Sequence, residues 1–240
     1  MPERPYTLLS CGISLDGYLG GPSRDRLLLS NDADFDRVDA VRADCDAILV
    51  GAQTIRSDNP RLLVRDAARR RQRVARGLRP SPVKVTVTAH AELDACANFF
   101  VTGDSEKLVY CASATAERAR ARLGHVATVV DCGDPVDRRH PVDVRHLCAD
   151  LADRGVRTLM VEGGGTMHTQ FLTADLADEL HLVVAPFFVG DSQARRFVDD
   201  GSFPWNPDRR ARLAEVRRIG DVVLLRYALS ARFRMDGAEA

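Results

Sequence analysis

The sequence has almost no lysine and no net charge. Of its 34 basic residues only Lys84 and Lys107 are lysines, a bias that we attribute mainly to the codon usage of a GC-rich genome. The 34 acidic residues balance the basic ones, so the formal net charge is zero. Proteins that bind nucleic acids or acidic membranes draw most of their affinity from excess positive charge. We therefore expect neither partner, although a local basic pocket remains compatible with the sequence.

Paired cysteines, a targeting segment and long apolar runs are also missing. The six cysteines are Cys11, Cys45, Cys96, Cys111, Cys132 and Cys148. None forms a C-x-x-C pair, so they indicate small core residues in a reduced compartment. The N-terminus has no basic stretch followed by an apolar one, and no 18 consecutive residues are apolar. We expect a soluble, cytoplasmic protein.

The length and apolar content fit one globular domain. The chain has 240 residues, of which 45% are hydrophobic and 28% charged, enough to bury a core. It contains no internal repeat and no clean linker. We predict a single domain over residues 1–240, with its core at about residues 5–229 and a flexible tail at residues 230–240.

Short apolar runs alternate with stretches of helical period along most of the chain. Strands are predicted at residues 6–13, 47–50, 83–88, 108–111, 126–130, 158–161 and 180–184. Helices are predicted at about residues 32–43, 115–123 and 144–154. This order predicts an α/β fold with a mostly parallel central sheet and helices on both faces.

Two later or less regular segments depart from that pattern. Residues 216–227, interrupted by the tight-turn pair Gly220-Asp221, predict a C-terminal antiparallel hairpin. Residues 69–79 contain six arginines and little apolar periodicity, which indicates an exposed loop or a frayed helix. A basic arm that binds an anion is the functional alternative.

A glycine-rich turn follows the predicted strand at residues 158–161. The segment Glu162-Gly163-Gly164-Gly165-Thr166 opens a helix, whose unpaired N–H groups suit a phosphate. It is not the Rossmann fingerprint, which requires glycine where this chain has His168, and a closely packed turn would also explain three glycines. Glu162 favours the binding interpretation, because an acid at the end of a buried strand is costly unless it is solvated, paired or functional.

A polar cluster follows the predicted strand that ends at Gly51. Its members are Gln53, Thr54, Arg56, Asp58, Asn59, Pro60, Arg61 and Arg65. Residues at the carboxyl ends of strands in open α/β sheets surround the ligand crevice, and arginine suits bidentate phosphate binding. A polar loop capped by Asn59-Pro60 is the structural alternative. Arg42, near the end of the first helix, is equally a residue that complements the helix dipole.

One partial motif indicates no metal site. His90-Ala91-Glu92 matches half of the zinc deaminase signature, but the P-C-x-x-C half is absent from the sequence. We therefore expect no bound metal.

Taken together, the motifs resemble the pyrimidine reductase family of riboflavin biosynthesis, which has a dihydrofolate-reductase-like fold. The resemblance rests on Ser14-Leu15-Asp16-Gly17, Val41-Arg42-Ala43, Asp46-Ala47-Ile48-Leu49-Val50-Gly51, Thr54, Asp58-Asn59-Pro60-Arg61-Leu62, Glu162-Gly163-Gly164-Gly165-Thr166 and Ala185-Pro186. It covers roughly residues 5–229. Because no deaminase domain accompanies it, the chain is most similar to the stand-alone archaeal and fungal form.

The resemblance implies an NADPH-dependent reduction. The substrate would be a 5-amino-6-(5-phosphoribosylamino)pyrimidine, in its uracil or 2,5-diamino form, whose ribose becomes a ribityl chain. The matching cofactor positions are Thr54, Asp58, Gly163, Gly164, Gly165 and Thr166. The matching substrate positions are Arg42, Leu62, Arg65 and Glu162, with the two arginines on the phosphate. Asp58 or Glu162 would be the catalytic acid that stabilises charge at C1′ or relays a proton, and we favour Asp58.

Three departures from the family pattern keep other functions open. Residues 24–29 alter the substrate side, Thr88-Ala89 replaces an Asp-Ser, and Asn59 replaces the second acid of an Asp-Asp-Pro. One alternative is a reductase with the same fold and cofactor that acts on a dihydropteridine or a secondary-metabolite precursor. Another is a non-catalytic NADPH-binding protein, against which the two intact acids argue.

A homodimer is also expected from the resemblance, because family members usually form two-fold dimers. An apolar edge at residues 180–184 and 187–189 would suit such a contact. Ordinary core packing is the alternative for this segment.

Overall fold

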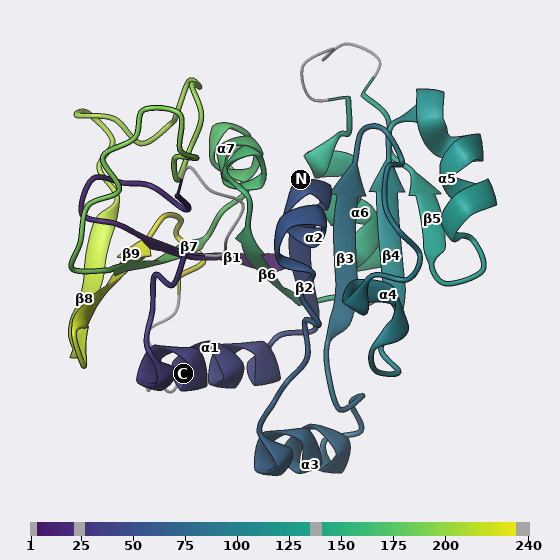
Figure 1. The fold of residues 1–240 in the computed structure, drawn as a ribbon, viewed down its shortest axis with the longest axis horizontal. Coiled ribbons are helices and arrows are strands. Elements are labelled where there is room, and N and C mark those ends of the chain that lie inside the picture. Colours follow the sequence, from purple (N-terminus) through teal and green to yellow (C-terminus); the bar gives the residue numbers. More distant parts are fainter. Residues whose placement is uncertain (1–3, 22–26, 135–140, 234–240) are drawn as a thin grey trace. The chain divides into compact units, whose positions relative to one another are not determined.

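The computed structural model describes residues 4–21, 27–134 and 141–233 of the chain (Figure 1). The chain divides into two compact units, the first built mainly from Asp36–Met160 and the second from Tyr6–Phe35 and the chain after Val161. The division falls within helix α1 (Asp32–Asp44) and within strand β6 (Thr158–Gly163). The single domain expected over the whole chain stays a prediction. Residues 24–26 of the altered substrate-side segment and residues 234–240 of the expected tail lie outside the described residues.

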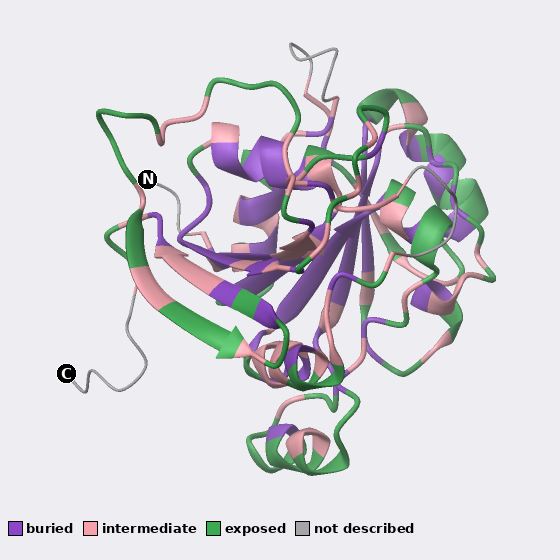
Figure 2. Ribbon diagram, turned by 60° about the vertical axis from the view of Figure 1, so that its left-hand side comes forward, coloured by how far each residue is buried: buried purple, intermediate pink, exposed green. Residues whose placement is uncertain are grey.

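The first unit contains four parallel strands in the order β5-β4-β3-β2. The strands are β2 (Ala47–Gly51), β3 (Val83–Thr88), β4 (Lys107–Cys111) and β5 (Thr128–Asp131). The helices are α2 (Ala52–Asp58), α3 (Ala67–Ala75), α4 (Asn98–Val101), α5 (Ala116–Leu123) and α6 (Val144–Asp153). Every residue of β2 is buried, as its continuous apolar run predicts (Figure 2). All four predicted strands are confirmed, with β5 starting two residues later than expected.

Helices cover both faces of this parallel sheet. On one face, Ile48 of β2 packs in a cluster with Ile55 of α2 and Val109 of β4. The next residue along β4, Tyr110, serves the opposite face, where its hydroxyl donates to a carboxylate oxygen of Asp150 in α6 at 2.6 Å. Alternate residues of a strand point to opposite faces, so one strand supports both layers. The predicted arrangement of helices around a mostly parallel sheet is confirmed.

The second unit combines parallel and antiparallel strand pairs. Its elements are β1 (Tyr6–Ile13), β7 (Glu179–Val184), β8 (Arg212–Ile219), β9 (Val222–Ala228) and α7 (Gly165–Thr173). Strand β7 pairs in parallel with β1 and antiparallel with β9, and β8 pairs with β9 across a turn at Gly220, where φ is +63°. The predicted hairpin is confirmed. The apolar edge predicted at residues 180–184 is wrong, because β1 and the hairpin flank that strand.

Residues 69–75 of the arginine-rich stretch belong to helix α3, which is the helical one of the two predicted alternatives. Asp66 caps the first turn of α3 with its side chain. Arg73 on this helix is buried, and its guanidinium donates to the carbonyl oxygens of Ala43 and Cys45 at 2.7 and 2.8 Å. The prediction of an exposed segment is therefore wrong at Arg73, which ties α3 to the carbonyl groups at the end of α1.

The cysteines follow the prediction with one clear exception. Four of them are buried and Cys11 is half-buried, whereas Cys96 is exposed. The main-chain N–H of Cys96 donates to the Asp94 carboxylate at 2.9 Å, which closes a local turn at the surface. The prediction of a core position is wrong for Cys96 because this turn precedes α4.

An ionic cluster joins four strands of the second unit, β1, β7, β8 and β9. Glu179 accepts hydrogen bonds from the Tyr6 hydroxyl at 2.7 Å and from the Arg226 guanidinium at 2.7 and 2.9 Å. The Nε2 atom of His181 lies 2.7 Å from the same carboxylate, and Arg226 also reaches Glu215 at 3.0 Å. Burial alone raises the pKa of Glu179, but these partners together outweigh it and hold the pKa at about 2.

Lys84 is buried within β3, although lysine is rarely found inside proteins. Its ammonium donates to the carbonyl oxygens of Phe99 and Thr102 at 3.1 and 2.6 Å. Burial, with a smaller contribution from Lys107, lowers the pKa of Lys84 to about 8. Lys107 is its register partner on β4 and donates to the Gly103 carbonyl at 3.3 Å.

Lys84 should make the protein more stable as the pH rises above 8. Unfolded lysine holds its proton to about pH 10.5, whereas folded Lys84 loses it near pH 8, so the folded state binds fewer protons between these values. Between pH 8 and 10 the wild type should gain about 2 kcal/mol of unfolding free energy relative to Lys84→Met, measured by urea titration. Lys107→Met is the matched control and should retain most of this gain, because it removes only the smaller of the two contributions to the pKa of Lys84. Parallel curves for wild type and Lys84→Met would contradict this account.

Candidate active site

Thr54 and Asp58 lie one helical turn apart on α2, which begins directly after β2. Thr54 is half-buried and Asp58 is exposed. Asp58 is the last residue of the helix, where the negative end of the helix dipole disfavours a carboxylate by about 0.3–1 kcal/mol. The position of Asp58 therefore does not serve helix stability.

Asn59, which stands in place of the family's second acid, has a structural role here. It ends α2 with a left-handed φ of +44°. Its side-chain oxygen accepts from the main-chain N–H of Asn98 at 2.7 Å, and its carbonyl accepts from the Asn98 amide at 3.2 Å. These contacts fix the point at which the chain leaves Asp58.

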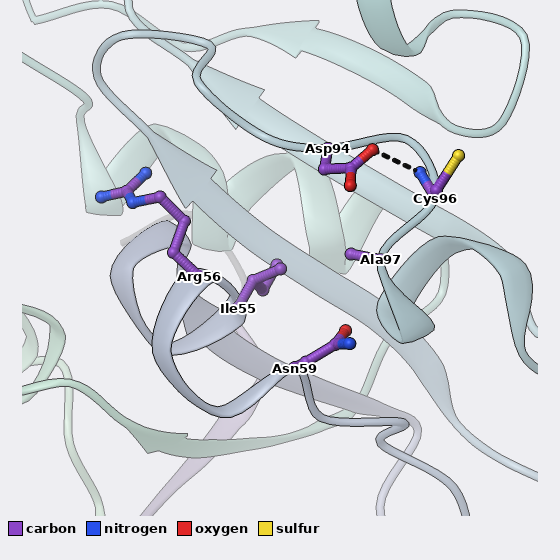
Figure 3. A pocket seen from close by; sticks show the side chains of 6 residues that line it. All are labelled: Ile55, Arg56, Asn59, Asp94, Cys96 and Ala97. Atoms are coloured by element: carbon purple, nitrogen blue, oxygen red, sulfur yellow. Dashed lines mark hydrogen bonds between the residues drawn. The ribbon is translucent and has the colours of Figure 1, made fainter. Parts of the chain in front are cut away.

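A pocket of about 270 Å³ lies beside the same helix (Figure 3). It is lined by Ile55, Arg56, Asn59, Asp94, Cys96 and Ala97. Neither Thr54 nor Asp58 is among these lining residues. Apart from polar-cluster members Arg56 and Asn59, this pocket holds none of the predicted site residues.

Residues 62–66 carry two predicted substrate positions and have no helix or strand of their own. Leu62 is buried, with a φ of +48° that is uncommon for leucine and costs about 1–3 kcal/mol of strain. Side chains bind the main-chain groups of the segment: Arg42 donates to Leu63 O at 3.2 Å, Val64 N donates to Ser81 Oγ at 3.0 Å, and Arg70 donates to Val64 O at 3.0 Å. Residues 62–66 are paired with no strand, so these hydrogen bonds from surrounding side chains hold the conformation of their main chain.

Asp39 on α1 completes this set of contacts. Its buried carboxylate accepts from the main-chain N–H groups of Arg65 and Asp66 at 2.5 and 3.0 Å. The Nε atom of Arg65 lies 3.7 Å from the same carboxylate, while 58% of the Arg65 side chain is exposed. Arg42 and Asp39 lie one turn apart on α1, so the structure brings both predicted phosphate-binding arginines to one anchored segment.

In the second unit, the glycine turn joins β6 to α7. Glu162 is half-buried near the end of β6. Gly163 and Gly164 follow with φ values of +146° and +72°, in a region that side chains rarely enter. Two consecutive residues of this kind explain the choice of glycine and leave main-chain N–H groups uncovered by side chains.

Gly165 is required by a close approach of the main chain. A Cβ atom at this position would lie 2.7 Å from the carbonyl oxygen of Arg196. The same loop is held to α7 by Thr166, whose hydroxyl donates to the Asp199 carboxylate at 3.2 Å, and by the Asp199 N–H, which donates to Thr169 at 2.8 Å. The segment 196–199 therefore lies directly against the first turn of α7.

The start of α7 fits a bound phosphate. The helix is nine residues long, and its first turn, Gly-Thr-Met-His, carries no acidic residue to oppose an anion. His168 is fully buried, and among the described residues neither of its ring nitrogens has a hydrogen-bond partner. Burial lowers the pKa of His168 to about 4, so it is neutral at physiological pH. The turn therefore has main-chain donors that suit a phosphate, and the nearby acids, Asp199 beside Thr166 and Glu162 on β6, lie outside the helix.

The Ser14-Leu15-Asp16-Gly17 motif joins two loops of the second unit. Asp16 accepts from the main-chain N–H groups of Val189 and Gly190 at 3.0 and 2.8 Å, and from the Ser14 hydroxyl at 2.5 Å. Desolvation raises the pKa of Asp16, but these hydrogen bonds outweigh it and hold the pKa at about 2. The motif therefore holds the loop after β7 in place.

The partial zinc motif has a surface position. His90 is exposed, and its carbonyl accepts a hydrogen bond from Arg118. Across residues 4–21, 27–134 and 141–233, no three His, Cys, Asp or Glu side chains gather as a metal would require. Within the same ranges, no helix combines the length and apolar character needed to cross a membrane.

A family model described as the RibD C-terminal domain matches residues 5–225. The chain belongs to the RibD C-terminal domain family. This membership confirms the resemblance to the pyrimidine reductases of riboflavin biosynthesis.

Two relatives align with this chain over almost their whole length. A protein of Archaeoglobus fulgidus named 2,5-diamino-6-ribosylamino-4(3H)-pyrimidinone 5′-phosphate reductase is 32% identical over 231 residues, covering 96% of this chain and 99% of the relative. A protein of the same name from Methanothermobacter thermautotrophicus is 33% identical over 228 residues, covering 94% of this chain and 99% of the relative.

A solved structure of a pyrimidine reductase-like protein from Corynebacterium diphtheriae shares the fold of this chain. The TM-score is 0.78 at 21% sequence identity, over 93% of this chain and 91% of the other. At this identity the likeness shows the fold alone. It confirms the α/β fold with a C-terminal antiparallel hairpin that the sequence predicts.

The predicted site residues of the chain fall into two groups. The first unit brings together Arg42, Leu62 and Arg65, with Thr54 and Asp58 on the preceding helix. The second unit holds the continuous turn from Glu162 to Thr166. Sequence reasoning missed Asp39, because an aspartate in a polar helix normally indicates a solvent-facing side. Its position three residues before Arg42, on the same side of the helix, was the available signal.

Proposed function

We propose that this chain is an NADPH-dependent reductase in riboflavin biosynthesis. It reduces the ribose of a 5-amino-6-(5-phosphoribosylamino)pyrimidine, in the uracil or 2,5-diamino form, to the ribityl chain. The proposal rests on the contacts of residues 62–66, where Arg42 binds the main chain and Asp39 binds the main-chain N–H of Arg65. Two relatives at 32% and 33% identity are named as 2,5-diamino-6-ribosylamino-4(3H)-pyrimidinone 5′-phosphate reductases.

The first unit supplies the groups for the substrate phosphate and the proton. Arg42 and Arg65 bind the phosphate, since guanidinium groups match its oxygens in charge and geometry. The buried Leu62 shapes the wall beside them. Thr54 contacts the nicotinamide side, and Asp58 passes a proton, through water, to the ring oxygen of the ribose as the ring opens.

The second unit supplies the groups for the cofactor. The main-chain N–H groups of Gly163, Gly164, Gly165 and Thr166 bind the pyrophosphate at the start of α7. NADPH, when bound, supplies the hydride that reduces C1′ of the sugar. Glu162 faces the substrate and orients its ribose. Holding both reactants in one orientation contributes about 7–11 kcal/mol in favourable model systems.

We also propose that residues 1–240 act as one domain, that the protein works in the cytoplasm and that it forms a homodimer. The composition and the absence of a linker in the sequence support the first two statements. Leu213 and Val216 are exposed on the outer strand β8, and Phe188 is exposed in the loop after β7. Large exposed apolar side chains of this kind favour contact with a second copy.

A two-substrate assay tests the proposed activity. Purified protein should oxidise NADPH in the presence of the uracil or the 2,5-diamino form of the phosphorylated pyrimidine, followed by the loss of nicotinamide absorbance. Dihydrofolate should be inert as a control substrate. Absence of oxidation with both pyrimidines would overturn the proposal, and turnover of dihydrofolate alone would favour the alternative reductase function.

A further inference from the structure

We propose that Asp39 is a positioning residue for the substrate phosphate: it fixes the main chain at Arg65 and so directs the Arg65 guanidinium. The inference rests on the proposed function, because it assigns a role to a residue behind the phosphate-binding arginine. Asp39 itself does not touch the substrate.

The contacts of Asp39 are directed at the main chain of the phosphate-binding segment. One carboxylate oxygen accepts from Arg65 N at 2.5 Å, and the other accepts from Asp66 N at 3.0 Å and from the Arg69 guanidinium at 3.1 Å. Hydrogen bonds to a buried, ionised carboxylate are stronger and shorter than neutral ones. Two successive N–H groups bound by one side chain fix the direction in which the Arg65 side chain leaves the backbone.

The segment needs such a contact because it lacks regular secondary structure. Leu62, three residues before Arg65, adopts a left-handed conformation that persists only where its surroundings hold it. Arg42 binds the Leu63 carbonyl at 3.2 Å from the same face of α1. Together, Asp39 and Arg42 bind a donor and an acceptor of the segment only two residues apart, which defines its orientation against the helix.

Asp39 also offsets the positive charge gathered here. Arg65 and Arg69 both lie within 4 Å of its carboxylate. Burial raises the pKa of Asp39, but the N–H groups of Arg65 and Asp66 and the Arg69 guanidinium outweigh it, so the pKa lies below its usual value. The ionised carboxylate reduces repulsion between the arginines, while the exposed part of the Arg65 side chain extends into solvent.

Asp36 provides a natural comparison on the same helix. It pairs with the same partner, Arg69, at 2.6 and 2.8 Å, and its side chain is exposed. None of the contacts described for Asp36 reaches the main chain of residues 62–66. Asp36 therefore ties α1 to α3 and shares with Asp39 an electrostatic attraction to Arg65, but not the hydrogen bonds to the main chain described for Asp39, so it separates the effect of charge from that of main-chain positioning.

The test compares Asp39→Asn with Asp36→Asn, each with its own thermal unfolding curve. Asp39→Asn should raise KM for the phosphorylated pyrimidine about tenfold while kcat and the KM for NADPH stay within twofold. It should also weaken the binding of ribose 5-phosphate, measured by calorimetry, about tenfold. Asp36→Asn should leave all of these values within twofold of the wild type, and Asp39→Glu, which restores the charge, should recover part of the loss.

Several results would overturn the inference. An unchanged KM for the phosphorylated substrate in Asp39→Asn would do so, as would an equal rise in both KM values with a lowered Tm, which marks a merely structural role. If the wild type reduces neither pyrimidine, the proposed function fails and the calorimetric comparison alone decides the role of Asp39. Equal affinities of wild type and Asp39→Asn for ribose 5-phosphate, or no binding by the wild type, would then overturn it.

Discussion

Replacing Asp58 with asparagine should lower kcat about 100- to 10,000-fold, the range associated with the loss of a general acid or base. The amide keeps the size of the side chain but cannot pass a proton to the ribose ring oxygen. Because Asp58 is exposed at the end of α2, the unfolding free energy should change by less than about 0.5 kcal/mol. Initial-rate kinetics with saturating NADPH would measure the effect.

The control for Asp58 is another carboxylate near the same helix. Asp94→Asn alters the pocket beside α2, retains an oxygen that can accept from the Cys96 N–H, and should keep kcat within twofold. Glu162→Gln separates the two candidate acids. If Asp58→Asn retained full activity while Glu162→Gln lost it, the proton would pass through Glu162 and the assignment of Asp58 would be wrong.

Replacing Glu179 with glutamine should destabilise the protein by about 3–5 kcal/mol, the cost of breaking a buried ion pair by removing one partner. The change removes the negative charge that Arg226 and His181 face inside the second unit. Urea unfolding at pH 7 would measure the loss. It is large against the 5–15 kcal/mol by which most domains are stable.

Glu215→Gln is the matched control for the Glu179 prediction. Glu215 contacts Arg226 from the more exposed side of the cluster, so its loss should cost less than about 1 kcal/mol. The lowered pKa of Glu179 also predicts a pH dependence. The contribution of Glu179 to the unfolding free energy is complete above about pH 4.5 and is lost as the pH falls toward 2. Equal losses for the two variants would contradict a special role for Glu179.

The sequence predicts those parts of the fold that depend on residues close together in the chain. The continuous apolar run of β2 and the Gly220-Asp221 turn each specify their structure within a few residues. The burial of Arg73 on α3 could not be predicted from its arginine-rich surroundings, because it depends on a carbonyl group 30 residues earlier in the chain, that of Ala43. Likewise, the exposed position of Cys96 follows from a hydrogen bond to Asp94 and not from its own chemistry.

The candidate site shows the same limit. The glycine turn was visible because Gly163 and Gly164 need backbone angles that few other residues adopt. Asp39 was not visible, because its importance comes from burial against the main chain of Arg65, 26 residues later. The spacing of three residues from Arg42 places Asp39 on the same side of α1, but it does not show that the carboxylate binds the main chain of a distant segment.

The near absence of lysine gives the two that remain a practical use. Lys107 lies partly at the surface, whereas Lys84 is sealed beneath the Phe99 and Thr102 carbonyls. An amine-reactive dye would therefore modify Lys107 in the native protein and reach Lys84 only when the segment around α4 opens. The rate at which Lys84 is labelled would therefore measure the rate of local opening in the first unit.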